Sequence, residues 1–150
     1  MTDFLKDIIK SSGNDYAGIA SEGIEGSDVT GFIDTGSYAF NALLSGSLYG
    51  GIPNNKIIAL AGESATGKSY FALGVCKKFL DDNPEGVILY FDTEQAITSD
   101  MIRDRGMDPA RVAIFPVATV EDFRHQAISI VDKYIETKDT KPVLVVLDSL

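Results

Sequence analysis

The chain has 150 residues, of which 45% are hydrophobic and 23% are charged, enough for one α/β domain with a real core and short for two. Its 13 basic and 22 acidic residues give a formal net charge of -9, which would repel nucleic-acid phosphate unless a local site overcame it. A single cysteine excludes an internal disulfide and suits a reducing cytoplasm, and no apolar run reaches the roughly 18 residues of a membrane span, so we expect a soluble, cytoplasmic protein without a membrane partner.

The first 28 residues are expected to be a helix and a linker, separate from the main domain. Apolar side chains at helical spacing between residues 3 and 10 predict a short amphipathic helix. Residues 11–27 are rich in glycine, serine and acidic residues, which is typical of a linker. We therefore divide the chain into residues 1–28 and a core at residues 29–150.

The core begins with a short helix and continues as alternating strands and helices. Ser37 can cap a helix over residues 38–44, and the glycine-rich turn at residues 49–53 ends it. Continuous apolar runs predict strands that are buried on both faces, at residues 57–61, 86–91, 112–117 and 143–147. Helical patterns separate these strands, at residues 68–81, at residues 98–105 and in the stretch that follows a Thr119 cap.

This alternation predicts an α/β fold with a parallel sheet, right-handed crossovers and flanking helices. The strand at residues 143–147 looks central, and a central strand needs a neighbour on each side. Because the chain stops at Leu150, we expect an incomplete sheet, in the front part of a longer protein or in a truncated product.

Residues 61–70, AGESATGKSY, contain the pattern G-x-x-x-x-G-K-[ST] of a P-loop, also called Walker A. Its glycines let backbone N–H groups turn toward phosphate oxygens, and the following helix presents its positive end to the same charge. Lys68 can reach the β and γ phosphates, and the Ser69 hydroxyl can bind Mg²⁺. A chance match in a turn is the alternative, but the predicted strand before the motif and helix after it favour a phosphate site. The residues assigned to nucleotide binding are Gly62, Glu63, Ser64, Ala65, Thr66, Gly67, Lys68, Ser69 and Tyr70.

Two acidic residues are candidates for the chemistry at this site. Asp148 ends an apolar strand, the Walker B arrangement that supports Mg²⁺, although an ordinary polar residue can also end a strand. Glu94 follows the strand at residues 86–91; if that strand lies beside the one before the loop, its carboxylate can orient an attacking water. The alternative for Glu94 is an exposed acid in a turn, and Asp92 has a weaker claim.

Other noticeable residues have ordinary explanations. Cys76 shares an apolar helical stripe and is expected to pack in the core. His125 lies about 200° around its helix from Phe123 and is expected to face solvent. The mixed charges between residues 100 and 105 predict a solvated helix face, while Met101 could contact an adenine or simply pack.

GESATGKS, YFDTEQAIT and VLVVLDSL, in this order and at these separations, resemble the RecA family of recombinases, and the recombinases of T4-like phages in particular. The approach FIDTGSYAFNALLSGSLYGGIPNNKI resembles the same family, so the likeness runs from about residue 30 to the end. It implies a RecA-like P-loop NTPase core over residues 29–150, truncated after Walker B. The family's DNA-contacting loops follow the strand of Asp148.

The resemblance also implies an activity and a set of partners. The family hydrolyses ATP with Mg²⁺, polymerises on single-stranded DNA as a homo-oligomeric filament, and drives homologous pairing and strand exchange in recombination and repair. Glu94 takes the position that activates water, with Lys68 as the second catalytic residue, and Asp148 supports Mg²⁺ with Ser69. Met101 stands where many members place an aromatic side chain on the adenine. Residues 1–28 are a candidate oligomerisation segment, and recombination mediator proteins are candidate partners.

Two functions of other classes stay open. A P-loop small-molecule kinase would use Glu94 to hold an acceptor hydroxyl, and its phosphate would go to a metabolite. A truncated domain could instead act only as an interaction module, docking through its N-terminal segment.

Overall fold

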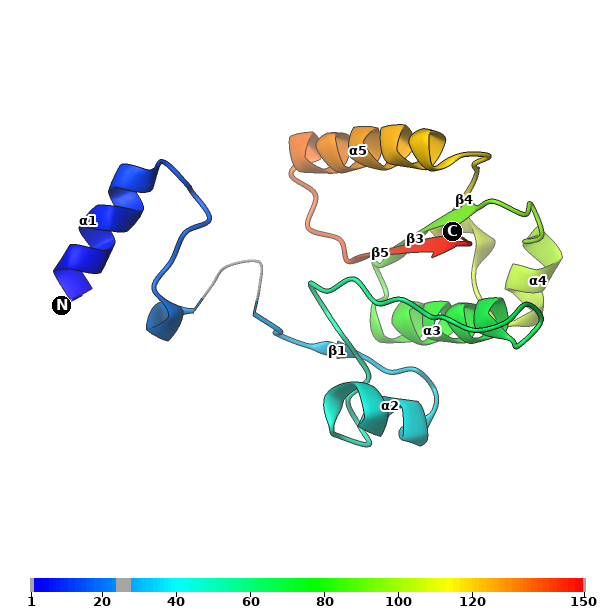
Figure 1. Ribbon diagram of the computed structural model, residues 1–150. Coiled ribbons are helices and arrows are strands. Elements are labelled where there is room, and N and C mark those ends of the chain that lie inside the picture. The colour runs from blue at the N-terminus through cyan, green and yellow to red at the C-terminus, as the bar shows by residue number, and fades with distance from the viewer. Residues whose placement is uncertain (1, 24–27, 150) are drawn as a thin grey trace. The chain divides into compact units, whose positions relative to one another are not determined.

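The computed structural model describes residues 2–23 and 28–149, and it divides the chain into two compact units (Figure 1). The first unit comprises Met1–Ile33 and Tyr38–Ala59, and the second comprises Asp34–Ser37 and Leu60–Leu150. No helix in the described ranges is both long enough and apolar enough to cross a membrane. The division of the chain into residues 1–28 and a core at residues 29–150 stays a prediction.

The first unit contains short elements. The predicted N-terminal helix is confirmed as α1 (Thr2–Ser12), and Lys6 on it pairs with Glu22 of the short 3-10 helix η1 (Ala20–Glu22) at 3.1 Å. Part of the expected linker, residues 24–27, lies outside the described residues. Three apolar side chains of α1 are exposed: Phe4, Leu5 and Ile8.

A small antiparallel pair follows in the same unit, formed by β1 (Phe32–Ile33) and β2 (Ile52–Pro53). The predicted helix between them is confirmed as α2 (Tyr38–Ser45), while capping by Ser37 stays a prediction. Gly51 has a φ of 136°, and a Cβ atom there would lie 2.1 Å from the carbonyl oxygen of Ile33. The close backbone approach therefore requires glycine at this position.

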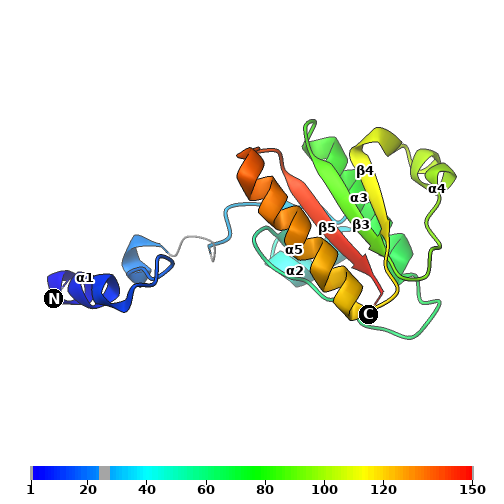
Figure 2. The ribbon, with the colours of Figure 1, turned by 90° about the horizontal axis from the view of Figure 1, so that it is seen from above.

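The second unit is built on three parallel strands. β3 (Val87–Asp92) lies between β4 (Val112–Pro116) and β5 (Val143–Asp148). Figures 1 and 2 show α3 (Lys68–Asp82) on one face of this sheet and α5 (Val120–Thr137) on the other. The unit is completed by α4 (Ser99–Asp104) and the 3-10 helix η2 (Pro109–Arg111). The expected α/β class with a parallel sheet is confirmed.

The core lies between α3 and the sheet. Alternate side chains of a strand point to opposite faces, so Ile88 and Tyr90 share one face of β3, and both are fully buried. The helix α3 contributes the buried side chains Leu73, Val75, Cys76, Phe79 and Leu80. Their spacing is the apolar stripe expected from the sequence, and it includes Cys76 in its predicted core position.

The opposite face of the sheet is packed more loosely. Phe91 contacts Phe115 and Phe123 there, with ring centroids 4.9 Å apart in both pairs. No described residue of α5 is fully buried, however, and Val131 and Val145 are about half exposed. A cavity of about 390 Å³ separates α5 from the sheet. Its apolar lining includes Val87, Leu89, Ile130, Val143 and Val145.

Two expectations about the sheet are wrong. Residues 57–61 form no strand and are exposed, with Ile57 at 101% and Leu60 at 42% of their reference areas. The strand that carries Asp148 is β5 at the edge of the sheet, not at its centre, and β3 therefore has β4 and β5 as neighbours rather than residues 57–61. An apolar run becomes a strand only where a neighbour pairs its backbone N–H and C=O groups, and the described residues give this run no such partner.

Side chains fix the ends of the helices. Thr98 accepts a hydrogen bond from the Met101 N–H at 3.2 Å, and Thr119 accepts one from the Asp122 N–H at 3.1 Å, which confirms the predicted Thr119 cap. Beyond the end of α3, Arg111 donates to the carbonyl oxygens of Leu80, Asn83 and Gly86. The Asn83 carbonyl oxygen also accepts the Gly86 N–H at 2.9 Å, and Leu80 lies in the last turn of α3, where carbonyl oxygens lack partners within the helix. Arg111 therefore joins η2 to the end of α3.

Candidate functional site

The glycine-rich loop, residues 62–69, curls around the side chain of its own lysine. The Lys68 ammonium donates to the carbonyl oxygens of Gly62 at 2.9 Å and Glu63 at 2.7 Å, and the Thr66 hydroxyl also donates to Glu63 at 2.9 Å. Gly67 has a φ of 92°, which a glycine adopts without steric cost. The loop thus gathers a positive charge at the point where α3 begins.

The first turn of α3 adds to this positive charge. Gly67 occupies the N-cap position and has no side chain with which to bind the free N–H groups of the first turn. These N–H groups and the helix dipole favour an anion, and Lys68 is the first residue of the helix. Most of the loop is exposed and Lys68 is half-buried, so an anion could reach it.

Asp92, at the end of β3, organises the turn that carries Glu94. It is 2% exposed, and its two carboxylate oxygens accept hydrogen bonds from the backbone N–H groups of Glu94 at 3.1 Å and Ile97 at 2.9 Å. Both oxygens are therefore used to shape the turn, which agrees with the weaker claim of Asp92 to a chemical role. The side chain of Glu94 itself is exposed.

Asp148, at the end of β5, is held by a buried tyrosine. The Tyr90 hydroxyl donates to Oδ2 of Asp148 at 2.7 Å, and Tyr90 is 0% exposed. Burial raises the pKa of the Tyr90 phenol above its ordinary value, and the hydrogen bond to Asp148 raises it further. The phenol consequently stays protonated and acts as a donor to the half-buried carboxylate.

The turn after β3 and the end of β5 are tied together. Thr93 donates its N–H to the carbonyl oxygen of Asp148 at 2.9 Å, and its hydroxyl accepts the Ser149 N–H at 3.0 Å. The Ser149 hydroxyl in turn lies 3.5 Å from Oε1 of Glu94. The structure therefore brings the two predicted acids, Glu94 and Asp148, to the same edge of the sheet.

The glycine-rich loop lies at this end of the unit. In both views of the ribbon, the start of α3 and the segment before it are at the end toward which β3 and β5 point (Figures 1 and 2). Strands that run parallel carry their carboxyl ends at one edge, where ligands of α/β sheets bind. Lysine, helix N-terminus and two carboxylates thus share one end of the sheet.

The two candidate nucleotide contacts outside the loop are linked by Arg105. Its guanidinium lies 4.8 Å from the ring centroid of Tyr70 and donates to the Met101 carbonyl oxygen at 3.5 Å. Asp100 and Arg103 form an exposed ion pair, as expected of a solvated face. The expectation was wrong for Arg105, which is half-buried because the Tyr70 ring covers one side of it. Sequence periodicity gave no sign of this contact, since it joins the first turn of α3 to the turn after α4.

The residues assigned to metal binding fit Mg²⁺ in their chemistry. Ser69 and Asp148 offer a hydroxyl and a carboxylate, the hard oxygen donors that Mg²⁺ prefers. Among the described residues, no group of three or more His, Cys, Asp or Glu side chains could hold a metal ion. Mg²⁺ commonly has only one or two protein ligands and takes the rest from phosphates and waters, so a hydroxyl and a carboxylate are compatible with its chemistry.

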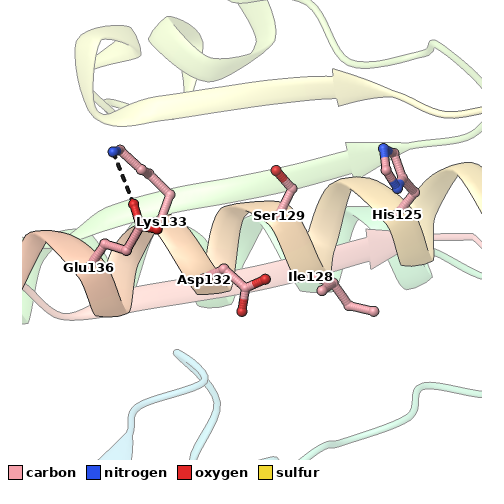
Figure 3. A pocket seen from close by; sticks show the side chains of 6 residues that line it. All are labelled: His125, Ile128, Ser129, Asp132, Lys133 and Glu136. Atoms are coloured by element: carbon pink, nitrogen blue, oxygen red, sulfur yellow. Dashed lines mark hydrogen bonds and ion pairs between the residues drawn. The ribbon is translucent and has the colours of Figure 1, made fainter.

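Two other features contain no predicted site residue. A hollow of about 410 Å³ runs along α5, and all of its lining side chains, His125 among them, come from that one helix (Figure 3). His125 is exposed, as predicted. Cys76 is 1% exposed, and burial raises the pKa of its thiol to about 12, so it is an inert core residue.

Comparison with known proteins identifies three relatives. The "Recombination and repair protein" of Enterobacteria phage T4 is 36% identical over 110 residues, or 73% of this chain and 27% of the relative. "Protein RecA" of Malacoplasma penetrans is 36% identical over 101 residues, or 67% of this chain and 28% of the relative. "Protein RecA" of Petrotoga mobilis is 24% identical over 146 residues, or 97% of this chain and 36% of the relative. The chain thus spans about a quarter to a third of these curated relatives. No family model matches it.

Proposed function

The chain is related to the RecA family over most of its length, and from this premise we propose that it provides the nucleotide-binding core of an ATP-dependent DNA recombinase. The relation places it among proteins of recombination and repair. We infer a P-loop NTPase core in which residues 62–69 bind the triphosphate of ATP. The observation that carries this proposal is the position of Lys68, Glu94 and Asp148 at one end of the parallel sheet.

The proposed roles follow from the chemistry of each group. Lys68 and the N-terminus of α3 neutralise phosphate charge, and the exposed carboxylate of Glu94 orients the water that attacks the γ-phosphate. Mg²⁺, when bound, would draw charge from the phosphate oxygens. Asp148 and Ser69 would hold it, directly or through water. Tyr70 and Met101 contact the nucleotide beyond the phosphates.

The proposed partners are those of a recombinase. Single-stranded DNA is the polymer on which copies of the protein assemble into a filament, and mediator proteins assist that assembly. The net charge of -9 requires that DNA binding use a local basic site. The exposed apolar face of α1 is the proposed oligomerisation surface.

An ATPase assay with and without single-stranded DNA tests the proposal. We expect ATP hydrolysis that DNA stimulates and that Lys68→Ala abolishes. Hydrolysis unchanged by DNA, with phosphate transferred to a small molecule, would identify a kinase instead. If the complete protein neither bound nor hydrolysed nucleotide but its copies still assembled with one another, it would be an interaction module.

A further inference from the structure

The hydrogen bond between Tyr90 and Asp148 joins the core of the sheet to its carboxyl edge. Tyr90 pairs with Val146 in the parallel register, and Asp148 lies two residues further along β5. Residues two apart on a strand share a face, and a long side chain can reach a diagonal neighbour on the adjacent strand. The phenol of Tyr90 does so, with its oxygen 2.7 Å from Oδ2 of Asp148.

The two ends of this contact differ in their freedom to move. Tyr90 is wholly buried within the well-packed face covered by α3, so its hydroxyl has a fixed position. Asp148 is half-buried at the last position of an edge strand, and within the described part of the chain no hydrogen bond engages its Oδ1. A hydroxyl that donates to a carboxylate forms one of the stronger hydrogen bonds in proteins. The rigid phenol therefore sets the rotation of the carboxylate.

We propose that Tyr90 is a positioning residue for Asp148, holding Oδ2 so that Oδ1 is presented to the Mg²⁺–nucleotide site. The inference rests on the proposed function, in which Asp148 supports Mg²⁺. Mg²⁺ requires near-ideal octahedral geometry, so a carboxylate that binds it or its water must be held in one orientation. Hydrogen bonds from a second residue to a metal ligand supply this orientation. Their loss commonly lowers metal affinity by about 10- to 100-fold.

Tyr90→Phe tests the inference because it removes only the hydroxyl and keeps the ring in the core. The readout is equilibrium binding of a non-hydrolysable ATP analogue by the complete protein, titrated with Mg²⁺ and repeated in EDTA. We expect Tyr90→Phe to raise the Mg²⁺ concentration for half-maximal binding by about 10-fold and to leave metal-free binding unchanged. Asp148→Asn serves as the reference for loss of the carboxylate.

Tyr134→Phe is the matched control. The hydroxyl of Tyr134, a residue of α5, donates to the Lys141 carbonyl oxygen, and the distance is again 2.7 Å. Lys141 lies beyond the last turn of α5, so this contact is away from the edge of the sheet that carries Asp148. Its removal should leave the Mg²⁺ titration at the wild-type position. In the double variant Tyr90→Phe/Asp148→Asn, the tyrosine substitution should cause no shift beyond that of Asp148→Asn alone.

The outcomes separate the inference from the function beneath it. An unchanged Mg²⁺ titration in Tyr90→Phe, alongside a shifted one in Asp148→Asn, would overturn the inference alone. Equal losses with Mg²⁺ and in EDTA, or an added shift in the double variant, would show a merely structural tyrosine and also overturn it. A wild-type protein that binds no nucleotide would overturn the proposed function, and the inference with it.

Discussion

Asp92 and Asp148 are register partners at the ends of adjacent parallel strands, yet their carboxylates have different surroundings. Asp92 is 2% exposed and uses both oxygens to accept backbone N–H groups. Asp148 is half-buried, and one of its oxygens accepts a hydrogen bond from the Tyr90 hydroxyl. Of these two acids at equivalent strand positions, Asp92 shapes the turn that follows its strand, and Asp148 faces the proposed site.

Asp92→Ala is expected to destabilise the protein, because it leaves the N–H groups of Glu94 and Ile97 without their buried acceptor. The loss should be about 1–3 kcal/mol of the free energy of unfolding, measured with urea. Asp100→Ala, which removes an exposed carboxylate, should cost less than about 1 kcal/mol. Equal effects of the two substitutions would show that Asp92 does not hold the turn.

Glu94→Gln is expected to preserve ATP binding and to lower ATP turnover at least about 100-fold, because a neutral amide cannot act as the base for an attacking water. Binding and single-turnover hydrolysis should be measured on the same preparation. Glu121→Gln, an exposed acid in the first turn of α5, is the matched control and should hydrolyse normally. Normal turnover in Glu94→Gln would remove Glu94 from the mechanism.

Lys68→Ala is expected to abolish detectable ATP binding, since it removes the cation that the glycine-rich loop surrounds. Isothermal titration calorimetry provides the measurement. Lys133→Ala, which removes an exposed lysine paired with Glu136 on α5, should bind ATP as the wild type does. If Lys68→Ala bound ATP with unchanged affinity, the loop would not be the phosphate site.

Arg111→Ala is expected to lower the free energy of unfolding by about 1–3 kcal/mol, because the carbonyl oxygens of Leu80 and Gly86 lose the guanidinium as donor and that of Asn83 keeps only the Gly86 N–H. Arg124→Ala, on the exposed side of α5, is the control and should have little effect. Urea unfolding of both variants checks the expectation. A similar midpoint for the two would contradict the proposed joining of η2 to α3.

The buried thiol of Cys76 predicts how stability depends on alkaline pH. Its folded pKa is about 12, against an ordinary value of 9.0, so only the unfolded chain ionises readily between these values. Ionisation of the thiol therefore leaves the free energy of unfolding unchanged below about pH 9 and lowers it progressively as the pH rises toward 12. Unfolding of wild type and Cys76→Ala across this range measures the difference. A thiol that reacts rapidly with a disulfide reagent in the native protein at pH 8 would contradict its burial.

Prediction from the sequence succeeded where the information is local. Helical spacing, the Thr119 cap and the apolar runs of β3, β4 and β5 lie within single segments, and each element formed where expected. The run at residues 57–61 has the same apolar pattern but forms no strand. Pattern alone could not decide this, because strand formation depends on a pairing neighbour.

The sequence by itself determined the helices α1 to α5, the strands β3 to β5, the glycine-rich turn before α3 and the identities of the candidate lysine and acids. The tertiary structure decided which of these meet. Tyr90 and Asp148 are 58 positions apart, and Arg105 reaches the Tyr70 ring of α3 from the turn after α4. Backbone propensity and capping act within a few residues, whereas such contacts arise from strand register and helix packing, which only the folded chain fixes.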